Sequence, residues 1–278
     1  MVEMYKKLKE VLRRSLRLKS LNGDKSRLRV NRDGWDSYAK DWMVLKEKRC
    51  IPDLDPKLCS GVDYLGDEWT LMNASTEHPY GLGIQSLDEF LDYINKRVIL
   101  PNLPKKQDLV IMEIGPGGGR ITKLLLQYCR TIYAVDISSE MLKHLKRRFG
   151  GEDRLKYILT DGVDIKGVPD DTLDIVVSFD AFVHIDPWGI YNYLEKVKPK
   201  MRRGAIGIVH FSDVETELGF KLFKNTVNSV LTSGESYGGF SVMNKGIMAK
   251  FLEELGYEVT SITNDIIPRD AVAIFRKK

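Results

Sequence analysis

Short apolar runs alternate with helical patterns through the second half of the chain. The runs are rich in Val, Ile and Leu, as in strands buried on both faces, and the stretches between them repeat apolar residues at helical spacing. The predicted strands are 109–114, 131–136, 155–160, 173–179, 205–211, 257–263 and 271–277, and the predicted helices are 120–129, 138–149, 186–201, 215–231 and 244–255. This order predicts a doubly wound α/β fold, with a mostly parallel seven-stranded sheet and helices on both of its faces.

The last strand is predicted to run antiparallel to the strand before it. Only the segment 264–270, NDIIPRD, joins the two strands. A parallel connection needs a crossover of about a dozen residues or more. The sheet should therefore end in a hairpin-like pair.

The N-terminal third of the chain is helical and irregular in pattern. A helix is expected over residues 35–48, followed by an irregular segment at 50–85 that is rich in Pro and Gly. Ser86, with Glu89 three positions later, forms a capping box that begins another helix. The expected parts are a basic amphipathic N-terminal arm (1–32), a helical and irregular cap (33–104) and a main domain (105–278) with a lid-like insertion (213–243).

Charge is distributed unevenly along the chain. Residues 1–32 hold 11 Lys and Arg against 3 Asp and Glu, a balance of +8, whereas the remainder has 32 against 36, a balance of −4. A basic amphipathic helix at 2–21 would either lie on an anionic membrane surface or cap the domain with its apolar stripe. Cys50, Cys59 and Cys129 show no C-x-x-C spacing, and no apolar run approaches the roughly 20 residues of a membrane span. We therefore expect a cytoplasmic protein with reduced thiols, and peripheral membrane contact through the arm stays open.

A glycine-rich turn joins the first strand of the main domain to its first helix. Gly115, Gly117 and Gly119 are spaced G-x-G-x-G, and Glu113 stands two positions before them. Glycine permits positive φ angles and lets the backbone approach a ligand closely. The dinucleotide pattern G-x-G-x-x-G fails in both frames because its third glycine is missing. The alternative is a tight turn that serves only strand–helix packing.

Acidic residues end the next two strands. Asp136 ends the second strand, where a carboxylate can accept hydrogen bonds from ribose hydroxyls, and Asp161 and Gly162 follow the third. The carboxyl ends of neighbouring parallel strands meet at one edge of the sheet, which is where open α/β sheets bind ligands. Taken alone, Asp136 would also serve as a cap for the helix that begins near Ser138.

These segments resemble the core of class I S-adenosylmethionine-dependent methyltransferases. The similar stretches, in chain order, are VIMEIGPGGGRIT, YAVDIS, LTDGVDI, LDIVVSFDAFVHI and YLEKVKPKMRRGAIGIVHF. The resemblance implies S-adenosyl-L-methionine as cofactor. It further implies that Glu113 organises the glycine loop, that Asp136 binds the ribose and that Ile137 packs on the adenine. The cofactor-binding residues implied are Tyr38, Glu113, Gly115, Pro116, Gly117, Arg120, Asp136, Ile137, Met141, Asp161, Gly162, Ser178 and Asp180.

His184 is the candidate catalytic residue. A hydroxyl acceptor benefits from a general base, and His184 lies a few residues past the end of the fourth strand. The alternative is a histidine that only orders this loop. Asp180, His184 and Asp186 have the chemistry of metal ligands, but no other such cluster supports them, so no metal is predicted.

The acceptor is expected to be a small molecule or a glycan, methylated on oxygen. No N-P-P-Y-type segment follows the fourth strand, where the sequence is Ser178-Phe179-Asp180-Ala181, and this disfavours nucleobase or amide acceptors. The resemblance implies that an aromatic helix before the core closes over the cofactor; the alternative is plain core packing. Two further groups of residues would line the acceptor pocket. The aromatic helix carries Trp35, Tyr38 and Trp42; the pocket groups are Trp69, His78 and Tyr80, and, in the insertion, Tyr237 and Phe240.

Two other functions fit the fold. One is a nucleotide-sugar or nicotinamide enzyme, against which the failed dinucleotide frames count. The other is a non-catalytic binding protein that uses the basic arm to hold RNA or a membrane. An intact glycine turn together with Asp136 favours a working cofactor site over this second alternative.

Overall fold

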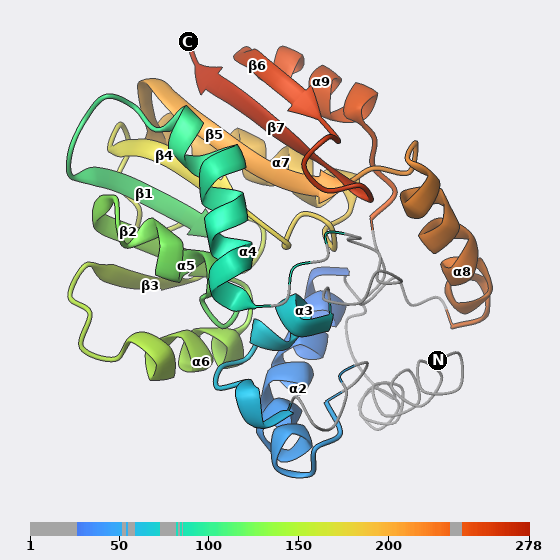
Figure 1. Cartoon of the computed structure of the whole chain (residues 1–278). Helices are drawn as coiled ribbons and strands as arrows, with labels where there is room; N and C mark the ends of the chain where they lie inside the picture. The colour runs from blue at the N-terminus through green and yellow to red at the C-terminus, as the bar shows by residue number, and fades with distance from the viewer. Residues whose placement is uncertain are drawn as a thin grey trace.

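A seven-stranded sheet forms the centre of the molecule (Figure 1). The computed structural model describes residues 27–51, 54, 59–72, 82, 84, 86–233 and 241–278. The strands are β1 (Leu109–Ile114), β2 (Cys129–Asp136), β3 (Leu155–Leu159), β4 (Leu173–Ser178), β5 (Met201–Ser212), β6 (Tyr257–Thr263) and β7 (Asp270–Lys277), and their order across the sheet is β3-β2-β1-β4-β5-β7-β6. Only β7 is antiparallel to its neighbours, β5 and β6. The predicted sheet and its antiparallel last strand are confirmed.

Helices cover both faces of this sheet. Figure 1 shows α4 and α5 in front of the strands and α7 behind them. The helices of the main domain and the segment leading into it are α4 (Leu87–Ile94), α5 (Arg120–Leu125), α6 (Ser139–Phe149), α7 (Pro187–Val197), α8 (Glu217–Ser233) and α9 (Lys245–Glu254). Side chains cap four of them at the N-terminus, as short polar residues do when they accept from a free N–H. The capping residues are Ser86, Ser138, Asp186 and Asn244. The capping box predicted at Ser86 is confirmed on the accepting side, where its Oγ lies 3.2 Å from the Glu89 N.

Alternation along the buried strands divides the core into two layers. In β1, Leu109 and Ile111 face the layer that contains α4, α5 and α6, whereas Val110 and Met112 face the layer that contains α7 and α9. Successive side chains of a strand point to opposite faces, so a strand covered on both faces is apolar throughout. This explains why β1 and β4 are continuous apolar runs in the sequence.

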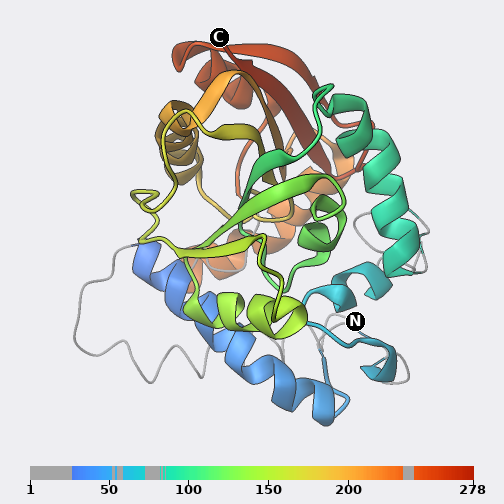
Figure 2. The same cartoon turned by 90° about the vertical axis from the view of Figure 1, so that its left-hand side faces the viewer.

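The cap contributes two helices, α2 (Arg27–Glu47) and α3 (Asp67–Met72). They enclose a third, smaller apolar cluster centred on Trp42, which is fully buried. Figures 1 and 2 show α2 lying beside α6, and the side chain of Asp36 in α2 accepts hydrogen bonds at the N-terminus of α6. The cap therefore packs next to the edge of the sheet at which β1 and β2 end.

Some element boundaries differ from those predicted. The helix expected at 120–129 ends at Leu125, and β2 begins at Cys129 instead of residue 131. Helix α2 begins at Arg27, ahead of the expected residue 35, and it crosses the expected boundary between arm and cap. No helix in the described part of the chain is long and apolar enough to cross a membrane. The expected helix at 2–21 and the candidate residues His78, Tyr80, Tyr237 and Phe240 lie outside the described residues.

Candidate active site

The glycine turn after β1 is shaped by three left-handed glycines with different surroundings. Gly115, Gly117 and Gly119 have φ angles of 71°, 53° and 91°. A Cβ atom at Gly115 would lie 2.3 Å from the Cβ of Ala181, and one at Gly119 would lie 2.5 Å from the ring of Phe149. A Cβ atom at Gly117 would meet nothing within 4 Å. Packing therefore explains the outer two glycines, whereas Gly117 borders open space at the end of the strand.

The cap closes on this turn from the other side. A Cβ atom at Gly118 would lie 1.7 Å from the carbonyl oxygen of Leu65, just before α3. Arg148 in α6 joins the two parts, because it donates to the Gly118 carbonyl at 3.2 Å and pairs with Asp67 of α3 at 2.8 Å. The cap therefore packs against the turn at Gly118, whereas Gly117 borders open space.

Glu113 lies beneath the turn as a buried carboxyl that is held by the Thr122 side chain. Its Oε2 accepts a hydrogen bond from the Thr122 hydroxyl at 2.6 Å. Burial raises the pKa of Glu113 to about 7; the Thr122 bond opposes this shift and the nearby Asp136 charge adds to it. A buried carboxylate without a cationic partner is costly. Glu113 is thus tied to α5 through Thr122, and a positive group bound next to its carboxylate would offset the cost of burial.

Asp136, at the end of β2, joins the turn to the next helix. Its Oδ1 accepts from the Ser138 N–H at 2.8 Å, and the backbone N–H groups of Gly117 and Ile137 also favour its charged form. Burial nevertheless raises the pKa of Asp136 to about 6. The cap of α6 is the side chain of Ser138, which accepts from the Met141 N–H at 3.0 Å. Asp136 is thus not the side chain that caps α6.

The predicted adenine-side residues meet an apolar group from the cap. A Cβ atom at Gly162 would lie 2.8 Å from Leu28 of α2 and 3.0 Å from Ile137. Asp161 is exposed, and its Oδ1 accepts from the N–H groups of Val163 and Asp164 at 2.9 Å each, so part of its carboxylate shapes its own turn. Leu28 was not anticipated, because the sequence places it in the basic arm.

Beyond β4, the predicted site residues form a buried polar group. The Ser178 hydroxyl donates to the Ile114 carbonyl at 3.1 Å and ties β4 to β1. Asp180, in a left-handed conformation with φ 59°, forms an ion pair with Arg120, the first residue of α5. Arg120 also donates to the Thr70 hydroxyl at 3.2 Å. Both charges are mostly buried, and their pairing offsets part of the cost of burial.

The candidate base lies under aromatic side chains of the cap. The ring of Trp35 in α2 meets the imidazole of His184 edge-on, with centroids 5.1 Å apart. Tyr38 lies 6.1 Å from Trp35 and 6.4 Å from Trp69, between ring centroids. The structure therefore brings together the aromatic residues that were predicted separately for cofactor and acceptor.

Glu68 in α3 joins two aromatic residues of α2, Tyr38 and Trp42, and the sequence analysis did not predict it. It accepts from the Tyr38 hydroxyl at 2.6 Å, from the Trp42 indole at 3.0 Å and from the Gly66 N–H at 2.7 Å. Burial raises its pKa to about 7, and the Tyr38 bond opposes the shift. Trp42, fully buried, belongs to the core of the cap, as the packing alternative expected. The short α3 lies in a segment whose composition indicated only loops.

The remaining predicted residues lie around the same edge of the sheet. Pro116 is buried in the turn, where its carbonyl accepts from the Gly119 N–H at 2.9 Å. Met141, in the first turn of α6, belongs to the apolar cluster of the cap. Among the described residues, no group of three or more His, Cys, Asp or Glu side chains is placed to hold a metal ion.

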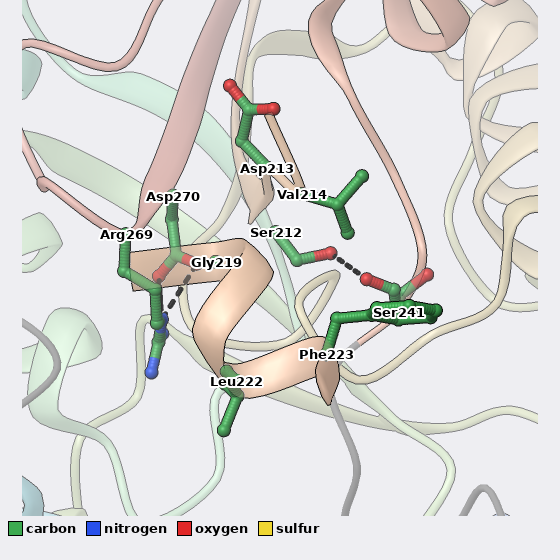
Figure 3. A pocket seen from close by; sticks show the side chains of 9 residues that line it. All are labelled: Ser212, Asp213, Val214, Gly219, Leu222, Phe223, Ser241, Arg269 and Asp270. Atoms are coloured by element: carbon green, nitrogen blue, oxygen red, sulfur yellow. Dashed lines mark hydrogen bonds and ion pairs between the residues drawn. The ribbon is translucent and has the colours of Figure 1, made fainter. Parts of the chain in front are cut away.

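A small cleft opens farther along the same edge, between the ends of β5 and β7 and helix α8 (Figure 3). Its lining residues are Ser212, Asp213, Val214, Gly219, Leu222, Phe223, Ser241, Arg269 and Asp270. Two buried polar atoms here, the Asp213 Oδ2 and the Ser241 Oγ, have no hydrogen-bond partner among the described residues. The cleft lies where the sequence indicated an insertion over the acceptor.

Comparisons with known proteins agree with this geometry. Residues 112–203 match the model of a methyltransferase domain. An uncharacterized methyltransferase of Geobacillus sp. (strain WCH70) is 28% identical over 130 residues, which are 45% of this chain and 56% of that protein. A ribosomal RNA small subunit methyltransferase of Arabidopsis thaliana is 47% identical over 55 residues, 19% of this chain and 16% of that protein. The chain thus spans about half the length, or less, of these relatives.

A solved structure shows the same fold over nearly the whole chain. The magnesium protoporphyrin IX methyltransferase of Synechocystis PCC 6803, with bound S-adenosylmethionine, superposes with a TM-score of 0.56 at 13% identity, covering 93% of this chain and 100% of that one. At this identity the likeness concerns the fold. Residues 112–203 are thus similar to a methyltransferase domain, and the chain has the fold of an S-adenosylmethionine-dependent methyltransferase.

Proposed function

We propose that this protein transfers a methyl group from S-adenosylmethionine to an oxygen atom of a small-molecule or glycan acceptor. The observation that carries the proposal is the meeting of Glu113, Gly117 and Asp136 at one edge of the sheet, with open space above Gly117. Glu113 and Asp136 are buried acids with raised pKa values. Such a site favours a ligand that brings positive charge and hydrogen-bond donors, which S-adenosylmethionine does.

Each residue has a part in holding the cofactor. Asp136 would accept hydrogen bonds from the ribose hydroxyls, and Glu113 would meet the amino group through the turn. Ile137, Leu28 and Gly162 form the apolar contact that suits an adenine ring. When bound, the cofactor supplies an electrophilic methyl group on a sulfonium, so the protein mainly has to align the acceptor and exclude water.

His184 is the proposed general base for a hydroxyl acceptor. It lies past the end of β4, and its backbone N–H donates to the Ala181 carbonyl at 3.0 Å. Ala181 in turn packs on Gly115 of the cofactor turn. The ring of Trp35 meets His184, and Tyr38 and Trp69 continue this aromatic group, which would help to keep water from the reacting atoms.

The segment after β4 supports the choice of acceptor. Asp180 is engaged by Arg120 here, and no N-P-P-Y-type segment is present to receive a nucleobase or an amide. Ribosomal RNA small subunit methyltransferases are similar to this chain over stretches of 55 to 134 residues, so structured RNA is included as an acceptor in the test below. The charge balance of the basic arm (1–32) supports contact with anionic membranes. Co-sedimentation of the full chain with anionic and with neutral vesicles would test this contact.

The test has two stages. Thermal shifts with S-adenosylmethionine and with NAD come first, and stabilisation by NAD alone would contradict the cofactor assignment. Radiolabelled S-adenosylmethionine is then incubated with the protein and with separate pools of metabolites, glycans and structured RNA. Label in the metabolite or glycan pool supports the proposal, whereas label confined to RNA overturns the acceptor class.

A further inference from the structure

A second histidine, His210 in β5, lies fully buried between two carboxylates. Its Nδ1 is 3.2 Å from the Asp180 Oδ1, and its Nε2 is 3.1 Å from the Asp270 Oδ2 at the start of β7. The ring of Phe179 stacks on the imidazole, with centroids 4.4 Å apart. Burial of an imidazole between two carboxylates costs free energy, and the carboxylate at each nitrogen favours the charged form of the ring.

The two carboxylates continue into arginines at both ends. Asp180 forms an ion pair with Arg120 at the start of α5, and Arg269 donates its Nε to Asp270 at 2.8 Å. The resulting chain of contacts crosses the sheet edge from the cofactor turn to the cleft beside α8, where Figure 3 shows Arg269 and Asp270 side by side. One end of the chain thus borders the cofactor site and the other borders the cleft.

The protonation state of His210 decides which part of Asp180 it holds. The Asp180 backbone N–H also points at the imidazole Nδ1, at 3.1 Å. A neutral imidazole that donates its Nε2–H to Asp270 uses its Nδ1 lone pair to accept from this N–H. A charged imidazole has no lone pair, so its Nδ1–H donates to the Asp180 carboxylate instead. One nitrogen therefore serves either the main chain or the side chain of Asp180.

The surrounding charges favour the imidazolium. Burial alone lowers the pKa of His210, but hydrogen bonds and attraction from Asp180 and Asp270 outweigh it, and the pKa is raised above the ordinary value. Burial would raise the pKa of Asp270, but Arg269 and His210 outweigh burial and the pKa is lowered. The charged groups that face His210 directly or through one partner are Asp180, Asp270, Arg120, Arg269 and, beside Asp270, Asp213.

We propose that His210 is a positioning residue that, as an imidazolium, holds the Asp180 carboxylate in the cofactor site, so that cofactor affinity follows the protonation of His210. The proposal rests on the proposed function, because it assumes that S-adenosylmethionine binds at this edge. Deprotonation removes the His210 side-chain donor from the Asp180 carboxylate, whereas the ion pair with Arg120 remains. The loss of one charge-assisted hydrogen bond corresponds to roughly a tenfold rise in Kd.

The test is a pH series of calorimetric titrations with S-adenosylmethionine, from about pH 5 to about pH 9, on the full chain. For the wild type we expect the Kd to rise as the pH passes the pKa of His210. His210→Asn cannot titrate in this range and should lack that inflection. Asp270→Asn removes one of the carboxylates that raise the pKa, so it should move the inflection to lower pH.

Asp174→Asn is the matched control. Asp174 is a similarly buried aspartate held by two cations, but it lies at the opposite end of β4. Its replacement should leave the inflection in place, even if it lowers the melting temperature. Other acids at the site also titrate and give inflections of their own. The inflection of His210 is the one that disappears in His210→Asn, moves in Asp270→Asn and stays in place in Asp174→Asn.

The outcomes separate the two proposals. If the wild type binds no S-adenosylmethionine at any pH, the proposed function fails. If the wild type binds and His210→Asn keeps both its Kd and its inflection, the positioning role is overturned. Should either variant fail to fold, an NMR titration of the wild-type imidazole decides: the positioning role requires His210 to lose its proton at the inflection, and an imidazole that keeps one charge state across it overturns the role.

Discussion

The two ends of the parallel strands carry buried acids in opposite settings. At the start of β4, Asp174 accepts from the Val110 N–H at 2.9 Å, from Lys106 at 2.9 Å and from Arg202 at 2.9 Å. Burial would raise its pKa, but these three donors outweigh burial and the pKa is lowered. At the other end, no cation among the described residues pairs with Glu113 or Asp136, and their pKa values rise to about 7 and about 6.

This contrast favours the turn end of the sheet as the end that binds a ligand. An acid whose charge is already neutralised by the protein contributes to stability, as Asp174 does. A buried acid without a cationic partner lowers the stability of the folded protein at neutral pH. Such acids are found at functional sites, where a ligand can supply the compensating charge. At the turn end of the sheet, the buried acids lack a compensating charge among the described residues, and a bound cofactor with an ammonium and a sulfonium would supply it.

The largest expected effect comes from filling the open space at the turn. Gly117→Val should raise the Kd for S-adenosylmethionine by roughly 100-fold or more, because the side chain enters the open space next to Gly117. Gly151→Val is the matched control: Gly151 also has a positive φ and open space around it, but it lies in the turn between α6 and β3. Calorimetry should show normal binding for the control. Normal binding by a folded Gly117→Val would place the cofactor elsewhere.

His184→Ala tests the chemistry at the same end. If His184 removes the acceptor proton, turnover should fall by roughly 100-fold, while cofactor affinity stays nearly unchanged. Steady-state rates with the acceptor found by the labelling screen, set beside calorimetry, separate the two quantities. Near-normal turnover would assign His184 to ordering the loop, and equal losses in rate and affinity would assign it to the cofactor site.

A pair of aspartate replacements compares the two ends directly. Asp136→Ala should weaken S-adenosylmethionine binding by roughly 1–3 kcal/mol through the loss of hydrogen bonds to a charged group. Asp174→Ala should leave binding unchanged and lower the free energy of unfolding by about 1–3 kcal/mol, since it strands the buried Val110 N–H. Calorimetry and denaturant unfolding on both variants measure this. A loss of affinity in Asp174→Ala would end the distinction between the two ends.

The pH dependence of stability should have opposite signs at the two ends. The raised pKa of Glu113 gives stability that is present at acid pH and lost as the pH rises toward about 7. Glu113→Gln keeps an acceptor for Thr122 and should gain on the wild type, by roughly 1–2 kcal/mol, above that pH. The lowered pKa of Asp174 gives stability that is lost as the pH falls, so the deficit of Asp174→Asn should shrink in acid. Parallel pH trends in the two variants would contradict this contrast.

Most of the sheet follows from the sequence, because strands covered on both faces must be apolar throughout. The exceptions lie where a strand leaves the core. The first part of β5 contains Arg202, Arg203 and Gly204, so its true start at Met201 carries no apolar signal. Helix α2 includes Arg27 and Leu28, which read as part of a charged arm in the sequence, and Leu28 meets the adenine-side turn.

The turn and Asp136 were predictable as one site, because parallel topology alone brings the ends of β1 and β2 together. His210 and Glu68 were not. His210 meets Asp270 across the antiparallel β5–β7 pair, whose register no spacing in the chain reveals. The role of Glu68 depends on its hydrogen bonds with Tyr38 and Trp42, which are far from it in sequence. Contacts of this kind depend on packing and leave no periodic trace.

The contact of Asp36 with α6 limits how this protein can be recombined. Its carboxylate accepts from the Ser138 hydroxyl at 2.6 Å and from the Glu140 N–H at 3.2 Å, beside the Ser138 N–H that Asp136 uses. A chimera that joins the main domain to a foreign N-terminal segment would leave those donors at a helix start without an acceptor. The cap is therefore not an exchangeable module, and any graft must bring its own carboxylate to that position.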